Sequence, residues 1–182
     1  MKNNKGITMI TLAVMLVILL MLATITMYYG NSAIKEAKLQ DLKTNMLLIQ
    51  ASLKNDLEKY HFETNTMNED EKNSKKSEYL KGKNISSPEC VDVKQAFDIL
   101  NNNQQIINKI NEDYPQVEGQ FEYYYLNENT LKQIGLNDVK SDSENGYYIA
   151  AYSMNPTFSN IVEIINTKGY FGNYSLKRIE TL

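Results

Sequence analysis

The side chains in this sequence that could do chemistry are few and far apart. The chain has one histidine, His61, and one cysteine, Cys90, so any Ser–His or Cys–His pair would have to include that single imidazole. A lone cysteine cannot form a disulfide within the chain, and no candidate base lies near Cys90 in sequence. We therefore expect Cys90 to act as a small apolar side chain rather than as a nucleophile.

The segment Ser141 to Gly146 has a weak likeness to a calcium-binding loop. With Gly146 at the sixth loop position, serines fall at the first and third positions, and Tyr152 stands where a bidentate glutamate is needed. A polar turn before a strand fits the segment better. The sequence also has no Gly-rich phosphate loop and no H-E-x-x-H, C-x-x-C or G-x-S-x-G. We predict that the protein is not an enzyme, and we name no catalytic residue, metal ligand or cofactor.

Charge and aromatic content give little support for a nucleic-acid partner. The 182 residues carry a formal net charge of -3, whereas nucleic-acid binders show a basic patch or stripe. Nine of the thirteen tyrosines follow residue 113, which invites a binding interpretation. Adjacent strand residues point to opposite faces, however, so packing explains Tyr123-Tyr124-Tyr125 and Tyr147-Tyr148 more readily than an aromatic site does.

The strongest pattern is an uncharged run at residues 7–29. These 23 residues would span roughly 34 Å as a helix, enough to cross a bilayer, and a secretory signal has an apolar region of only about 7–15 residues. The run predicts a transmembrane helix and a single-pass protein of the cell membrane. Lysines lie on both sides of the run, so charge alone leaves the orientation open.

The residues at the start of this run carry a family resemblance. Lys2 and Lys5 precede Gly6, and an uncharged segment opening Ile7-Thr-Met-Ile-Thr-Leu follows. This resembles the amino-terminal signature of the type IV pilin superfamily, which includes pilins, pseudopilins of type II secretion and competence pseudopilins. The resemblance implies cleavage between Gly6 and Ile7 by a prepilin peptidase and methylation of the new amino terminus.

The resemblance also implies what the retained helix does. It would be stored in the lipid bilayer, would contact other pilin-like subunits and the membrane platform of the assembly machinery, and would leave the carboxy-terminal head extracytoplasmic, at the cell surface or in a filament after assembly. Family members usually have Glu at the fifth mature position, where this chain has Thr11. That departure favours a minor pilin or pseudopilin over a major pilus subunit.

The helical pattern continues beyond the uncharged run. Apolar residues recur every three or four positions and form one stripe, with polar residues opposite: Leu39, Leu42, Met46, Ile49, Leu53, Leu57 and Tyr60. One helix from about residue 7 to residue 60, with a weak point at Gly30, is the expected arrangement. A membrane anchor with a short coiled-coil stalk is the structural alternative.

The remaining residues predict a small α+β head. We expect a helix that begins at Asp92 and ends before Pro115, a short helix near residues 130–135, and strands near 120–126, 147–154, 160–165 and 170–174. Short connections favour an antiparallel β-meander of three or four strands packed on the long transmembrane and amphipathic helix. The predicted organisation is a leader (1–6), an assembly helix (7–29), its amphipathic continuation (30–60), a polar loop (61–89) and the head (90–182).

Two functions from different classes follow. The first is a pilin-like structural subunit, a minor pilin or pseudopilin of a type IV pilus, competence or type II secretion-like filament. The alternative is an uncleaved single-pass membrane protein whose extracytoplasmic domain binds a partner or senses a ligand.

Overall fold

The computed structural model describes residues 5–101, 105–167 and 170–171. Two compact units divide the chain, Met1–Asp41 and Leu42–Leu182. The described part of the first unit belongs to the helix α1 (Lys5–Thr64), whose last 23 residues belong to the second unit. The helix continues through Gly30, the predicted weak point, so the expectation of one continuous helix there is confirmed.

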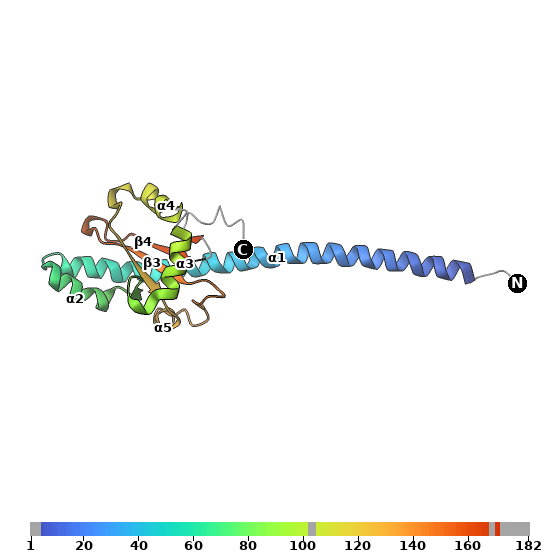
Figure 1. Ribbon diagram of the computed structural model, residues 1–182, viewed down its shortest axis with the longest axis horizontal. Coiled ribbons are helices and arrows are strands. Elements are labelled where there is room, and N and C mark those ends of the chain that lie inside the picture. The colour runs from blue at the N-terminus through green and yellow to red at the C-terminus, as the bar shows by residue number, and fades with distance from the viewer. Residues whose placement is uncertain (1–4, 102–104, 168–169, 172–182) are drawn as a thin grey trace. The chain divides into compact units, whose positions relative to one another are not determined.

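The second unit contains a five-stranded antiparallel sheet (Figure 1). Its strands lie in chain order, each beside the next: β1 (Lys83–Asn84), β2 (Phe121–Leu126), β3 (Tyr148–Ser153), β4 (Val162–Asn166) and β5 (Tyr170–Phe171). Around it lie α2 (Glu69–Tyr79), η1 (Pro88–Cys90), α3 (Val91–Asn101), α4 (Gln105–Asp113), η2 (Pro115–Val117), α5 (Glu128–Gln133) and η3 (Pro156–Phe158). The predicted α+β class and antiparallel meander are confirmed, with β1 as an additional short strand.

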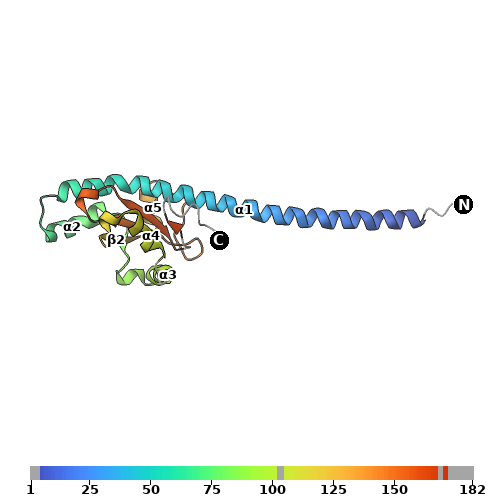
Figure 2. The ribbon, with the colours of Figure 1, turned by 90° about the horizontal axis from the view of Figure 1, so that it is seen from above.

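Helices cover both faces of this sheet, as Figure 2 shows for α1 and α3. The Tyr123 ring of β2 contacts Phe97 of α3, with 5.2 Å between ring centroids. Because side chains alternate along a strand, the neighbouring Tyr124 points to the other face, where it contacts Tyr152. Tyr148 shares that second face and belongs to one apolar cluster with α1 side chains such as Ile49. Every residue of β3 and β4 is buried as a result.

The amphipathic stripe predicted for the long helix forms one wall of the core. Its members within the second unit are at most 9% exposed: Leu42, Met46, Ile49, Leu53, Leu57 and Tyr60. They belong to one apolar cluster with side chains of the sheet such as Ile149 and Ile164. The prediction for these six residues is confirmed, while the side chain of Leu39 lies outside the described residues.

Residues 69–79, expected to belong to a polar loop, instead form α2. Asn68 and Glu71 build a capping box in which each side chain accepts a hydrogen bond from the other's backbone N–H. Lys72 pairs with Glu69 and Lys75 with Glu78, each three residues apart on the helix surface. Local capping and charge pairing therefore support a helix that has no buried residue of its own.

The prediction of a membrane-spanning helix is wrong for the part of the chain that the structure describes. None of the helices there combines the length and the apolar character needed to cross a bilayer. The single-pass membrane localisation with an extracytoplasmic head is corrected with it.

The other expected elements of the head form close to their predicted positions. The single helix predicted between Asp92 and Pro115 is described as two, α3 and α4, with residues 102–104 outside the described residues. The short helix α5 begins two residues earlier than expected, with Asn127 as its N-cap. The last predicted strand is described only at Tyr170–Phe171, and residues 172–174 lie outside the described part.

Candidate functional site

The three residues singled out by the family resemblance lie at the start of α1. The predicted cleavage bond joins Gly6 and Ile7, the second and third residues of the helix. The side chain of Ile7 and all of Lys2 lie outside the described residues. Thr11, at the position where the family usually has Glu, is exposed on the helix surface. Cleavage between Gly6 and Ile7 stays a prediction.

The first unit exposes apolar side chains on every side of its helix. Nine consecutive large apolar residues, from Val14 to Leu22, are each 50–67% exposed. At 100° per residue, nine positions pass two and a half times around the helix axis. A helix that is apolar all round is normally enclosed by other structure, and large exposed apolar surfaces mark interaction sites. We call residues 11–27 the apolar helix surface.

Two of the three threonines in the apolar helix surface, Thr24 and Thr26, satisfy their hydroxyl groups within the helix. The Thr24 hydroxyl donates to the Leu20 and Met21 carbonyls over 2.9 Å. The Thr26 hydroxyl donates to the Leu22 carbonyl over 2.7 Å. Because these hydrogen bonds lie within the helix, the two side chains can be covered by apolar neighbours without losing them.

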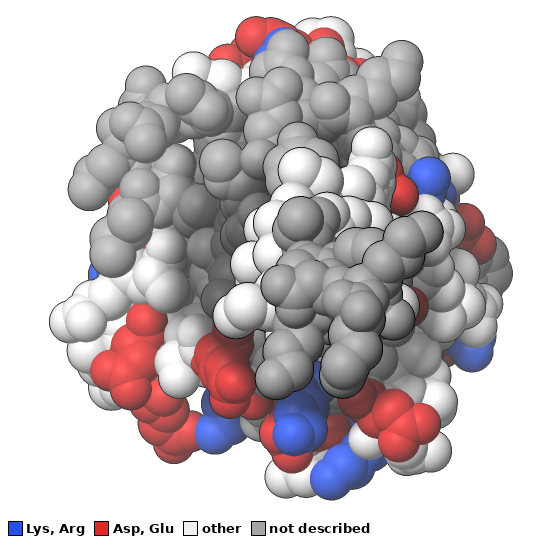
Figure 3. Space-filling model, turned by 90° about the vertical axis from the view of Figure 1, so that its right-hand side faces the viewer, with Lys and Arg blue, Asp and Glu red and all other residues white. Residues whose placement is uncertain are grey.

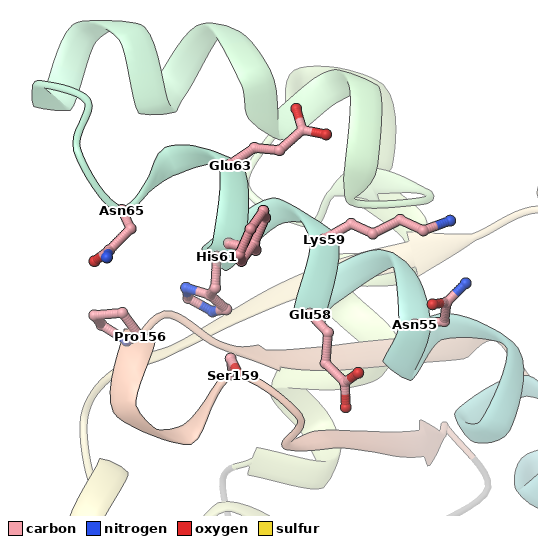
Figure 4. A pocket seen from close by; sticks show the side chains of 9 residues that line it. Asn55, Glu58, Lys59, His61, Glu63, Asn65, Pro156 and Ser159 are labelled. Atoms are coloured by element: carbon pink, nitrogen blue, oxygen red, sulfur yellow. The ribbon is translucent and has the colours of Figure 1, made fainter.

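A separate polar pocket lies in the second unit, between the last turns of α1 and η3 (Figure 4). We call it the α1–η3 pocket. Its volume is about 590 Å³, and it is open to solvent. A smaller hollow shares His61, Asn65 and Pro156 with it. The lining residues are Asn55, Glu58, Lys59, His61, Phe62, Glu63, Asn65, Pro156 and Ser159.

Phe62 and His61 give this pocket its character. Phe62 is 85% exposed, more than any other exposed large apolar side chain of the described residues. His61, by contrast, is buried, and its Nε2 lies 2.8 Å from the Ser153 carbonyl. A carbonyl oxygen only accepts, so Nε2 carries the proton and Nδ1 of the neutral ring is an acceptor. Burial lowers the pKa of His61, as does the nearby charge of Lys72, although the hydrogen bond to Ser153 opposes this.

A second group of polar side chains is buried where β4 meets α1 and the end of α4. The Glu163 carboxylate accepts from the Tyr114 hydroxyl over 2.7 Å and from the Gln50 amide over 3.2 Å. The same Gln50 amide donates to the Val162 carbonyl over 2.6 Å. Desolvation raises the pKa of Glu163, opposed by these hydrogen bonds and by the charge of Lys54. Its Oε1 accepts both hydrogen bonds and the residue is 5% exposed, so we assign this group to the core.

Cys90 and the segment from Ser141 to Gly146, which the sequence analysis considered for chemistry, have structural roles in the fold. Cys90 is 1% exposed, and burial raises the pKa of its thiol. Asp142 accepts hydrogen bonds from the backbone and side chain of Asn145, as a polar turn requires. No cluster of three or more candidate ligands that could hold a metal ion occurs among the described residues.

The tyrosines of the two clusters pack against neighbouring side chains and do not form an exposed aromatic surface. Tyr124 and Tyr148 are buried, and the half-buried Tyr125 and Tyr147 rings meet edge to face, with 5.6 Å between centroids. Desolvation raises the pKa values of Tyr123 and Tyr148 to about 12. These clusters follow the strand alternation on which the packing interpretation was based.

The α1–η3 pocket was not found from the sequence. Phe62 falls between Tyr60 and Thr64, outside the buried stripe, and this off-stripe aromatic residue was the available signal. His61 follows Leu57 by four residues and so continues the stripe, which is why it is buried. The partners from η3 come from nearly a hundred residues later, and no local pattern indicates them.

Figure 3 shows described acidic and basic side chains beside one another along the lower edge of the face it draws. Comparison with known proteins assigns no family to the chain. A scan against family models, a search of curated proteins and a search of solved structures each returned no match.

Proposed function

We propose that the protein is a pilin-like structural subunit, a minor pilin or pseudopilin, that assembles with similar subunits through the amino-terminal part of α1. The observation that carries this proposal is the apolar helix surface. Nine consecutive apolar residues exposed around the whole circumference need neighbours on several sides, which a single partner helix does not supply.

The sequence before this surface agrees with the same function. Lys5 and Gly6 stand directly before Ile7, in the order in which a prepilin leader ends. The proposed processing is cleavage between Gly6 and Ile7 by a prepilin peptidase, followed by methylation of the Ile7 amine. Thr11 adds no carboxylate that would pair with that amine in a neighbouring subunit, which favours a minor position in the assembly.

The processing is tested by mass spectrometry of the amino terminus of the protein purified from its native host. We expect a mature chain that begins at Ile7 with a methylated amine. Replacement of Gly6 by a residue with a bulky side chain, Gly6→Val, should leave the leader attached, while Lys5→Arg, which keeps the charge, should be processed normally. An intact Met1 terminus on the wild-type protein would overturn the proposed processing.

Assembly is tested separately, by a charge placed on the apolar helix surface. Leu19 is 60% exposed, so Leu19→Glu should fold as the wild type does but should not join assemblies, because a carboxylate between apolar helices is left desolvated. Ser52→Glu, at an exposed position of α1 in the second unit, is the control and should assemble normally. Sedimentation of tagged chains from native-host lysates measures both. Equal assembly of the two variants would contradict the proposal.

A further inference from the structure

We propose that the α1–η3 pocket binds an arginine side chain presented by a partner protein. The lining residues come from the last three turns of α1, from Asn65 directly after it, and from η3 and its C-cap Ser159, all within the second unit. This proposal is independent of assembly through the amino-terminal part of α1, because none of its residues belongs to the apolar helix surface.

The pocket has many hydrogen-bond acceptors that no protein group uses. Within the described residues, no hydrogen bond or ion pair engages the side chains of Asn55, Glu58, Asn65 or Ser159. Together they offer a carboxylate, two amide oxygens and a hydroxyl, and His61 adds its Nδ1. A guanidinium group has five N–H donors and no acceptor, so its hydrogen-bonding groups are the complement of this set.

Phe62 supplies a flat apolar surface beside these acceptors. Glu58 and Phe62 are four residues apart, so they project from the same side of α1 with about 5–6 Å between their Cβ atoms. A guanidinium group stacked on the Phe62 ring can reach the Glu58 carboxylate with its edge. An ammonium group lacks the planar shape that allows stacking and bidentate pairing together.

The charges of the pocket also favour a cation. The lining contains two glutamates, Glu58 and Glu63, and one lysine, Lys59. The buried His61 ring is neutral and adds no charge. Glu63 is partly engaged, because it accepts from the Tyr79 hydroxyl over 2.5 Å. Figure 4 shows Lys59 extending away from Pro156 and Asn65. The carbonyl end of α1 lies here as well, and the helix dipole places partial negative charge at that end.

The test is a titration of the full isotope-labelled chain, kept monomeric in a non-ionic detergent, with N-acetyl-arginine amide. The side-chain amide NMR signals of Asn55 and Asn65 report on the pocket directly. We expect saturable shifts of both signals. N-acetyl-citrulline amide, which has the same shape without the charge, and N-acetyl-lysine amide should each bind at least threefold more weakly. Equal binding of citrulline or lysine amide would overturn the proposal, as would saturable shifts confined to other residues or no saturable shift.

Variants locate the contact within the pocket. Glu58→Gln and Phe62→Leu should each weaken arginine amide binding by about threefold. Both side chains are exposed, so their thermal unfolding should match the wild type. Glu144→Gln removes one exposed carboxylate outside the pocket and should leave binding unchanged. If Glu144→Gln weakened arginine amide binding as much as Glu58→Gln, the loss of affinity would come from the change in net charge of the protein. The assignment of the binding site to this pocket would then be wrong.

Discussion

Glu163 and Tyr114 are joined by a 2.7 Å hydrogen bond, in which the phenol of one residue donates to the carboxylate of the other. Tyr114 follows α4 directly, and Glu163 lies in β4, so the bond ties the end of a helix to the sheet that it covers. Gln50 of α1 donates to the same carboxylate oxygen from its own helix. One buried acid thus connects three separate segments of the second unit.

Replacing this acid by its amide should stabilise the protein at neutral pH. Burial raises the pKa of Glu163, so its protonated form is favoured in the folded state; the stabilisation is complete below the unfolded value of 4.5 and is lost as the pH rises through the folded pKa. Glu163→Gln keeps an acceptor oxygen for Tyr114 and Gln50 but carries no charge. We expect its free energy of unfolding at pH 7 to be about 1 kcal/mol higher than that of the wild type.

Chemical denaturation between pH 4 and pH 8 measures this difference. The gap between Glu163→Gln and wild type should widen as the pH rises. Glu118→Gln, at an exposed position, should follow the wild-type curve throughout. Parallel curves for Glu163→Gln and the wild type would show that the buried carboxylate does not titrate as stated.

His61 should give the opposite pH dependence. Its pKa is lowered in the folded state, so the unfolded chain binds more protons below pH 6.5, and stability is lost as the pH falls through the folded pKa. His61→Gln can still donate to the Ser153 carbonyl but does not titrate, so its unfolding free energy should change less than that of the wild type between pH 7 and pH 5. An identical slope for both proteins over this interval would contradict the assignment.

The buried stripe of α1 allows a matched comparison of two leucines. Leu53 is fully buried against the sheet, whereas Leu48, five residues earlier in the same helix, is 48% exposed. Leu53→Ala should lower the free energy of unfolding by about 2–5 kcal/mol, because a cavity is added to the lost burial. Leu48→Ala changes helix propensity equally and should cost under about 1 kcal/mol. Equal losses would mean that α1 is not packed as described.

The capping box should determine whether α2 forms. Asn68→Ala removes the acceptor for the Glu71 N–H and should destabilise α2 by about 1 kcal/mol, seen as faster amide hydrogen exchange at residues 72–79. Asn73→Ala, at an exposed interior position of the same helix, should leave exchange unchanged or slow it. Fast exchange of α2 in the wild type itself would argue against this helix.

Gly82 should tolerate substitution less well than Gly119, although both have positive φ angles, +106° and +74°. A Cβ at Gly82 would lie 2.6 Å from the Tyr125 carbonyl oxygen, whereas one at Gly119 would meet nothing within 4 Å. Gly119→Ala should cost about 1 kcal/mol from backbone strain alone, and Gly82→Ala should cost clearly more. Thermal unfolding of the two variants measures the difference, and equal midpoints would exclude the close approach.

The parts of the fold that could be predicted are those with a local period. The apolar stripe from Leu42 to Tyr60 repeats every three or four residues, and strands such as β3 stand out by aromatic and β-branched content. α2 escaped prediction because its sequence has no apolar period; a cap and charge pairs support it instead. The membrane-spanning prediction is wrong for the described residues, in which no helix combines the length and the apolar character that a bilayer requires.

Of the two candidate sites, one could be predicted from the sequence and the other could not. The apolar helix surface could be predicted, because an uncharged run is visible in any reading of the chain. The α1–η3 pocket could not, since it joins His61 to Pro156 through a fold that brings the two segments together. The burial of Glu163 also depends on long-range packing. Glu163 is the one charged residue of β4, but its partners Tyr114 and Gln50 are 49 and 113 residues away in the sequence.

The hydrogen bond from Gln50 to Val162 joins residues 112 positions apart in the chain. During synthesis at about 5–20 residues per second, the apolar stripe of α1 therefore leaves the ribosome about 6–22 s before the strand that it packs against. For most of that interval Ile49, Leu53 and Leu57 lack the complete sheet, because β3 and β4 are its third and fourth strands along the chain. The second unit can therefore complete its core only late in synthesis, and until then its nascent helix exposes apolar side chains.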